Sequence, residues 1–193
     1  KEINEIQEAV FLIDMNVGFC EKGNLADPSI KAIVPNIVPI IDAVVRKGEG
    51  FFVVNDAHDE NSVELKRYAG HCHNEEESRT IKELAIYEEY ANRTFYKNST
   101  CALFAPGMMD MLMEMVNLKR VVIVGCCTDI CVEQFVLTLK TYFNTLNQPS
   151  RIIVPMTCVE TYETDIHKGD LMNVLALYKM QMNGIEIVRE IIK

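Results

Sequence analysis

The stretch "VIVGCCTDICVEQF", residues 122–135, changes character at its midpoint. Its first half continues the apolar run "VVIVGC" (121–126), which is typical of a strand buried on both faces of a parallel sheet. Its second half opens "TDICVEQFVLTLKTYF" (128–143), a long amphipathic pattern that predicts a helix. A buried strand that turns directly into a helix is the repeating unit of α/β proteins.

Other apolar runs carry the same strand signal. They are "AVFLIDM" (9–15), "FFVVND" (51–56), "RIIVPM" (151–156) and "IEIV" (185–188), with "RTFYKN" (93–98) as a weaker candidate. Helical patterns lie between them, at 37–47, 106–116, 128–143 and 167–183. Because strands alternate with helices, we predict an α/β fold with a doubly wound parallel sheet.

The helix at 37–47 has boundary signals of its own. Asn36 is expected to cap it, and Gly48 to end it. Pro39 is expected in its first turn, where a missing N–H costs nothing.

The segment 57–92 is long, charged and loop-like, and loops of this length are usually functional. We find no repeat, low-complexity tract or linker, so we predict a single domain over 1–193 with an elaborated loop at 57–92. The methionine stripes at 108–115 and 172–182 are expected in the core or in a subunit contact. The oligomeric state stays open, with a homo-oligomer as one alternative.

Composition excludes several classes of protein. A net charge of −9, without a basic run, argues against nucleic-acid binding. No apolar stretch reaches the ~18 residues of a membrane span. The opening "KEINEIQEAV" is charged and lacks the apolar core of a signal peptide, so we expect a cytoplasmic protein. Seven irregularly spaced cysteines do not form a disulfide framework and are expected as free thiols.

Reactive side chains stand where the predicted strands end. Asp14 ends the first strand, Asp56 the second, Lys97 lies on the weaker strand, and Cys131 follows the strand 121–126. Taken singly, each has an ordinary explanation as a capping carboxylate, a surface lysine or a buried thiol. In open α/β sheets, however, sites form beyond the carboxyl ends of the strands, so their convergence favours a functional site.

Position distinguishes the three cysteines of the opening stretch. Cys131 falls in the first turn of the predicted helix, where N–H groups and the helix dipole favour a thiolate. Cys126 belongs to the strand and should be buried, whereas Cys127 lies at the turn, where its backbone N–H could face an oxyanion. No second cysteine pair completes a metal knuckle. Cys131 is therefore the candidate nucleophile.

The stretch "NDAHDENSVELKRYAGHCH" (55–73) suggests a metal site. Asp56 and His58 alternate on extended chain and point the same way. His71 and His73, together with Glu64, which lies between His58 and His71 in the sequence, could complete a mixed nitrogen and oxygen site. Such a site suits zinc, iron or manganese. The alternative is a charged loop with incidental histidines.

Together these motifs resemble a known family. "FLIDMNVGFCEKGNL", "VNDAHDEN", "GHCH", "FYKNS" and "VGCCTDICV" are similar, in the same order over about residues 9–160, to the isochorismatase-like cysteine hydrolases and most closely to nicotinamidases. The resemblance implies a six-stranded parallel sheet flanked by helices on both faces. It also implies a catalytic triad of Asp14, Lys97 and Cys131.

The resemblance assigns further roles around the triad. A cis peptide at Cys126–Cys127 would aim the backbone amides of Cys127 and Cys131 at the oxyanion. A divalent metal, most simply zinc, would hold a pyridine nitrogen. The implied metal ligands are Asp56, His58, His71 and, as a further ligand, Glu64, and the implied pocket residues are Phe19, Tyr68 and Phe95.

The activity so implied is hydrolysis of nicotinamide to nicotinate and ammonia, a step of NAD salvage. Departures such as Thr100, which replaces an aromatic residue, touch the pocket wall more than the triad. One alternative is a related hydrolase of another small amide, a ureido compound or isochorismate. Another is a non-catalytic metal- or redox-sensing protein.

Overall fold

The computed structural model describes residues 1–191, which contain one parallel sheet. Its strands run in the order β3 (Arg93–Lys97), β2 (Gly50–Asp56), β1 (Glu8–Ile13), β4 (Arg120–Cys126), β5 (Arg151–Pro155) and β7 (Glu186–Val188). A two-residue strand, β6 (Val159–Glu160), also pairs with β4. The predicted α/β parallel sheet is confirmed, including the weaker strand candidate. β6 was not predicted, because two residues are too short for a hydrophobic pattern.

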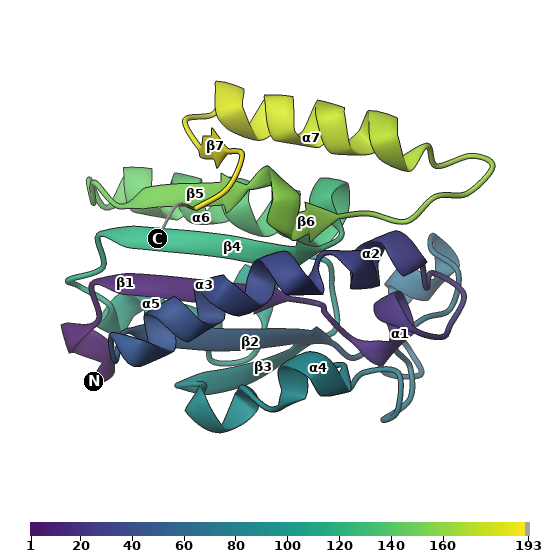
Figure 1. The fold of residues 1–193 in the computed structure, drawn as a ribbon, viewed down its shortest axis with the longest axis horizontal. Helices are drawn as coiled ribbons and strands as arrows, with labels where there is room; N and C mark the ends of the chain where they lie inside the picture. The colour runs from purple at the N-terminus through teal and green to yellow at the C-terminus, as the bar shows by residue number, and fades with distance from the viewer. Residues whose placement is uncertain (192–193) are drawn as a thin grey trace.

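Helices cover both faces of the sheet, as Figure 1 shows. One face carries α1 (Val17–Cys20), α2 (Pro28–Ala32), α3 (Val34–Arg46) and α4 (Lys82–Ala85), and the other carries α5 (Met108–Glu114), α6 (Glu133–Thr145) and α7 (Gly169–Met182). Alternate residues of β1 enter the two cores, since Phe11 packs on the α6 side and Leu12 on the α3 side. The result is a three-layer sandwich.

The predicted start of the helix at 37–47 is wrong. α3 begins at Val34, which places Pro35 in the first turn and Pro39 in the second. The Asn36 side chain does not cap the helix but donates to Thr157 O at 2.9 Å. The residue that marks the start of α3 is Pro35, because the fixed backbone angle of proline favours the first turn of a helix. The end is as expected, with Gly48 in the left-handed conformation at φ +61°.

The other predicted helices are present with shifted limits. The pattern at 128–143 divides into a π-helical turn, η5 (Thr128–Val132), and then α6. The segment 57–92 contains α4 and two 3₁₀ turns, η2 (Val63–Lys66) and η3 (Glu88–Tyr90). Three more such turns are η1 (Ile3–Glu5), η4 (Ala102–Phe104) and η6 (Met156–Cys158). Within residues 1–191 no helix is long and apolar enough to cross a bilayer.

The strand order reverses direction between β1 and β4. From β1 the chain adds β2 and β3 on one side, and from β4 it adds β5 and β7 on the other. Such a switch point opens a crevice beyond the carboxyl ends of the two central strands. Gly125 lets these ends come together: its φ is +118°, and an added Cβ would lie 2.0 Å from Ile13 O. Asp14 and Cys127 therefore emerge side by side.

Candidate active site

Three buried side chains from three elements meet at the switch point. Asp14 follows β1, Lys97 ends β3, and Cys131 lies in η5. Lys97 Nζ lies 2.9 Å from Asp14 Oδ2 and 3.6 Å from Cys131 Sγ. The structure thus brings together the acid, the base and the thiol that the strand ends predicted.

Burial determines the charge states of this group. Desolvation raises the pKa of Asp14 from 3.8 to about 6, even though Lys97 opposes the shift. Desolvation would lower the pKa of Lys97, but the carboxylates of Asp14 and Asp56 hold it well above its ordinary value. The pair therefore combines a cation that stays charged with a carboxyl that titrates near neutral pH.

The expectation that the start of the helix favours a Cys131 thiolate is not met. Burial raises the pKa of this thiol well above its ordinary value, and Asp14 adds to the effect while Lys97 opposes it. The opening turn is also π-helical rather than α-helical. In this environment Cys131 is a neutral thiol beside a carboxylate that can accept its proton.

The other two cysteines lie as predicted. Cys126 is fully buried, and its Sγ donates to Asp14 O at 3.0 Å. The peptide bond between Cys126 and Cys127 is cis, as the resemblance implies. Cys127 and Cys131 both line the same pocket. A backbone N–H in such a position can bind a developing oxyanion.

Asp56, His58 and His71 form a second cluster next to the first. His58 Nε2 and His71 Nε2 lie 3.0 Å and 3.1 Å from the same Asp56 oxygen, Oδ2. The two Nε2 atoms are 3.3 Å apart. All three side chains are buried, and they are the group in residues 1–191 that could hold a metal ion.

Outer contacts orient both imidazoles toward a common point. His71 Nδ1 lies 2.7 Å from Ala69 O, a carbonyl that can only accept, so Nδ1 carries the proton and Nε2 presents its lone pair. His58 Nδ1 lies 3.2 Å from Asn98 Oδ1 and 3.1 Å from Ser62 Oγ. Two imidazole nitrogens and one carboxylate oxygen match the donors of a catalytic zinc site. The residues present therefore fit a divalent metal.

The two other candidate metal ligands, His73 and Glu64, lie outside the cluster of Asp56, His58 and His71. His73 is exposed. The Glu64 carboxylate accepts from Thr100 N at 2.9 Å, so its role as a ligand stays a prediction.

A small pocket connects the two clusters. Its walls are Phe19, Leu25, Asp56, Tyr68, His71, Thr100, Cys127, Ile130, Cys131 and Tyr162. Phe19 and Tyr68 both line this pocket, and their role in binding a substrate stays a prediction. Phe95 is buried in the core on the α6 side and does not line the pocket, so a role for it in binding stays a prediction.

Several site residues were missed. Tyr162 closes the pocket from a loop after β6 and stacks on His167 with ring centroids 4.2 Å apart. His167 Nε2 in turn lies 2.8 Å from Asp129 Oδ2. Tyr162 and His167 follow the two-residue strand β6, and no spacing motif marks them in the sequence. Asn98 was detectable in principle, since it comes directly after Lys97 at a strand end.

Fold and site together define a three-layer α/β protein with a buried Asp–Lys–Cys cluster at the switch point of its parallel sheet. A family model described as "Isochorismatase domain" matches residues 8–182. The chain therefore belongs to the isochorismatase family of hydrolases. No curated protein matches its sequence.

Solved structures share the fold at low sequence identity. The pyrazinamidase/nicotinamidase of Streptococcus mutans UA159 is 22% identical, covers 94% of this chain and 100% of its own, and has a TM-score of 0.78. Pyrazinamidase of Pyrococcus horikoshii, solved in complex with zinc, is 22% identical over 95% and 99% of the chains, with a TM-score of 0.75. N-carbamoylsarcosine amidase of Thermoplasma acidophilum is 22% identical over 95% and 96%, with a TM-score of 0.70. At this identity the likeness concerns the fold.

Proposed function

We propose that this protein is a cysteine amidohydrolase that cleaves nicotinamide to nicotinate and ammonia. The observation that carries the proposal is the shared lysine: Lys97 lies 3.6 Å from the Cys131 thiol and 2.8 Å from Asp56 of the candidate metal cluster. A thiol nucleophile next to a metal site suits a substrate whose amide is attached to a heterocycle, because the ring nitrogen can bind the metal while the amide lies at the thiol. The pyrazinamidase and nicotinamidase neighbours are consistent with it.

The first half of the reaction uses Asp14 as the base. Asp14 accepts the Cys131 proton, and Lys97 stabilises the resulting thiolate. The thiolate attacks the carboxamide carbon and forms a C–S bond, while the carbonyl electrons move to oxygen. The backbone N–H groups of Cys127 and Cys131 stabilise that oxyanion. Asp14 returns the proton to nitrogen as the C–N bond breaks, which releases ammonia and leaves a thioester.

The second half consumes water. Asp14, ionised again, takes a proton from a water molecule, and the hydroxide attacks the thioester carbon. The C–S bond breaks, the thiolate recovers a proton from Asp14, and the acid product leaves. Each group is thereby restored, with one water consumed and one ammonia released.

Asp56, His58 and His71 would hold a divalent metal, with zinc the simplest occupant for two imidazoles and a carboxylate. Such an ion would supply a Lewis acid, to which a ring nitrogen of the substrate could bind, and would thereby help position the substrate. Aromatic side chains in the pocket wall would then pack against the substrate ring. Phe19 and Tyr68 flank His71, with ring centroids 5.3 Å and 6.3 Å from the imidazole.

Ammonia release tests the proposal. Purified protein supplied with zinc should release ammonia from nicotinamide, and the Cys131→Ala variant should not. The comparison substrates for the related hydrolases are N-carbamoylsarcosine, which also releases ammonia, and isochorismate, which contains no nitrogen and is followed by its own consumption. If either is turned over faster than nicotinamide, the nicotinamidase assignment is wrong while the hydrolase family stands. The sensor alternative requires a thiol pair that oxidises together, whereas all seven cysteines here are buried.

A further inference from the structure

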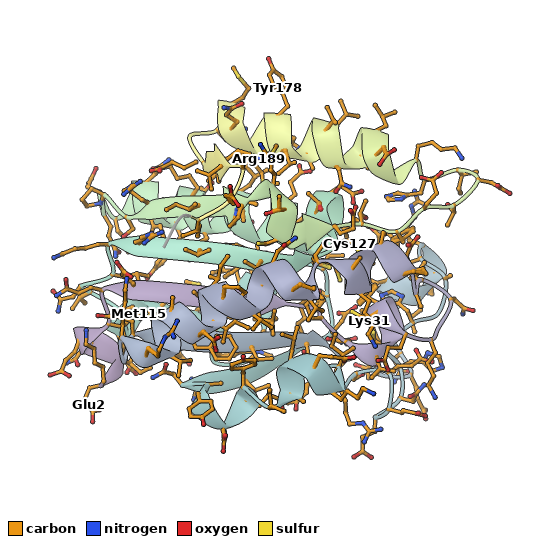
Figure 2. All side chains as sticks on the ribbon, viewed as in Figure 1. Glu2, Lys31, Met115, Cys127, Tyr178 and Arg189 are labelled. Atoms are coloured by element: carbon orange, nitrogen blue, oxygen red, sulfur yellow. The ribbon has the colours of Figure 1, made fainter. Side chains whose placement is uncertain are left out.

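The loop between β6 and α7, residues 161–168, contributes to the wall of the candidate active site and has no regular secondary structure. It brings Tyr162 into the pocket that Cys127 and Cys131 also line. Because β6 pairs with the end of β4, the loop starts next to Cys127, which Figure 2 shows at that end of the sheet. A loop without a ladder of backbone hydrogen bonds depends on side-chain contacts to keep one conformation.

His167 contacts Tyr162 in two ways. The two rings stack, with their centroids 4.2 Å apart and their planes inclined by 23°. His167 Nδ1 also lies 2.8 Å from Tyr162 O, a carbonyl that can only accept, so Nδ1 carries a proton. The imidazole therefore holds both the ring and the backbone of this pocket residue.

The imidazole is itself anchored to the turn that carries the candidate nucleophile. His167 Nε2 lies 2.8 Å from Asp129 Oδ2, and Asp129 belongs to η5, two residues before Cys131. The side chain of Asp129 is only 3% exposed. Within residues 1–191 its other carboxylate oxygen has no hydrogen-bond partner. Since buried polar groups require partners, the contact with His167 is the one that fixes this carboxylate.

We propose that His167 is a positioning residue: paired with Asp129, it holds Tyr162 in the pocket wall and thereby strengthens substrate binding. His167 does not line the pocket itself, so it acts through Tyr162. The kinetic part of the test rests on the proposed hydrolysis of nicotinamide. Access to Cys131 provides a second measurement that needs no substrate.

Steady-state kinetics with nicotinamide tests the role. His167→Phe keeps an aromatic ring for the stack but removes both hydrogen bonds, so KM should rise by about 10-fold while kcat changes by less than about threefold. His73→Phe makes the same substitution at an exposed histidine outside the pocket and should leave both constants unchanged. An unchanged KM would overturn the proposal. A fall in kcat alone would do so as well, because it would place the effect on the turn that carries Cys131.

Variants of Asp129 separate positioning from a general loss of structure. Asp129→Asn keeps the hydrogen bond, because the amide can donate to the Nε2 lone pair of a neutral imidazole, so KM should stay within about twofold. Asp129→Ala leaves the imidazole and its stack in place but removes the anchor, so it should match His167→Phe and replaces that variant if it does not fold. An Asn variant as impaired as the Ala variant would contradict the role of this hydrogen bond.

A double-mutant cycle tests the route through Tyr162. Tyr162→Ala removes the ring that His167 holds, so it should raise KM by itself. Adding His167→Phe to Tyr162→Ala should then raise KM no further. Additive effects of the two substitutions would show that His167 acts by another route and would overturn the proposal.

Alkylation by iodoacetamide tests the pocket wall without a substrate. Cys131 is buried but lines the pocket, so a loosened Tyr162 should expose it. His167→Phe should raise the alkylation rate of Cys131 by about 10-fold, measured by peptide mass spectrometry, whereas Cys126, buried in the strand, should stay unmodified. If the rate rises but the unchanged protein does not hydrolyse nicotinamide, the proposed substrate is wrong and the positioning role stands. An unchanged rate would overturn the positioning role.

Discussion

Lys97 and Asp56 form a buried ion pair, with Nζ and Oδ1 2.8 Å apart, and this pair links the candidate nucleophile Cys131 to the candidate metal cluster. The same Nζ lies 2.9 Å from Asp14, so a single cation serves two carboxylates. Burial disfavours the charged form of Asp56, but Lys97 and the two histidines hold its pKa below the usual range. Asp14 has fewer such partners and keeps a raised pKa. Two carboxylates around one lysine are therefore tuned for different tasks.

Removing Lys97 should disturb both clusters. Lys97→Met leaves two buried carboxylates without their cation, so we expect the free energy of unfolding to fall by about 3–5 kcal/mol, measured by urea denaturation. Lys47 pairs with Glu8 at the surface, and Lys47→Met should change stability little. Equal effects of the two substitutions would contradict a central structural role for Lys97.

Activity should depend on pH through Asp14. The carboxyl accepts a proton only when it is ionised, and its pKa lies at about 6 rather than 3.8. The value of kcat/KM for nicotinamide should therefore be level above neutral pH and fall tenfold per pH unit below about pH 6. Asp14→Asn should be inactive at every pH. A midpoint near pH 4 would mean that Asp14 is not the base.

The opening cysteines should respond differently to truncation. Cys131→Ala should reduce turnover by about 10⁴-fold or more, since it removes the attacking sulfur. Cys126→Ala should mainly lower stability, by about 1–3 kcal/mol, because this side chain is fully buried in the strand. Ammonia release and thermal unfolding of both variants separate the two roles. An inactive Cys126 variant beside an active Cys131 variant would reverse the assignment.

The metal cluster should matter to substrates that carry a ring nitrogen. His58→Ala should lose bound zinc and raise KM for nicotinamide, whereas His73→Ala, an exposed histidine outside the cluster, should do neither. Benzamide has the same amide without the nitrogen, so it should be a poorer substrate and should be less sensitive to chelation. Equal cleavage of both amides after chelation would assign the metal a structural role.

Gly125 should not tolerate a side chain. In Gly125→Ala the new Cβ would lie 2.0 Å from Ile13 O at a φ of +118°, so β1 and β4 must separate. We expect a loss of stability of about 3 kcal/mol or more. Gly48 also has a positive φ but has nothing within 4 Å of an added Cβ. Gly48→Ala should cost only about 1 kcal/mol, and equal losses would show that conformation rather than contact is limiting.

Much of the fold could be predicted because the strands are continuously apolar. Runs such as 121–126 and 51–56 lack the alternation of polar and apolar residues that a surface helix shows, and both form interior strands of the sheet. The start of α3 was misplaced because Asn36 and Pro35 give competing local signals, and contact with Thr157, distant in sequence, engages the asparagine. β6 and the short helices near the site depend on such long-range contacts. They are too short to show a hydrophobic periodicity in the sequence.

The sequence by itself determined which reactive residues follow the strands, because a parallel sheet brings its carboxyl ends to one edge. It also determined the Asp–x–His pair and the two cysteines at the turn. Only the tertiary structure decided their protonation, since burial raises the pKa of Cys131 while Lys97 stays charged. It alone placed Tyr162 in the wall of the pocket and the side chain of Phe95 in the core on the α6 side of the sheet. The physical reason is that desolvation and long-range contacts depend on packing, which no local pattern records.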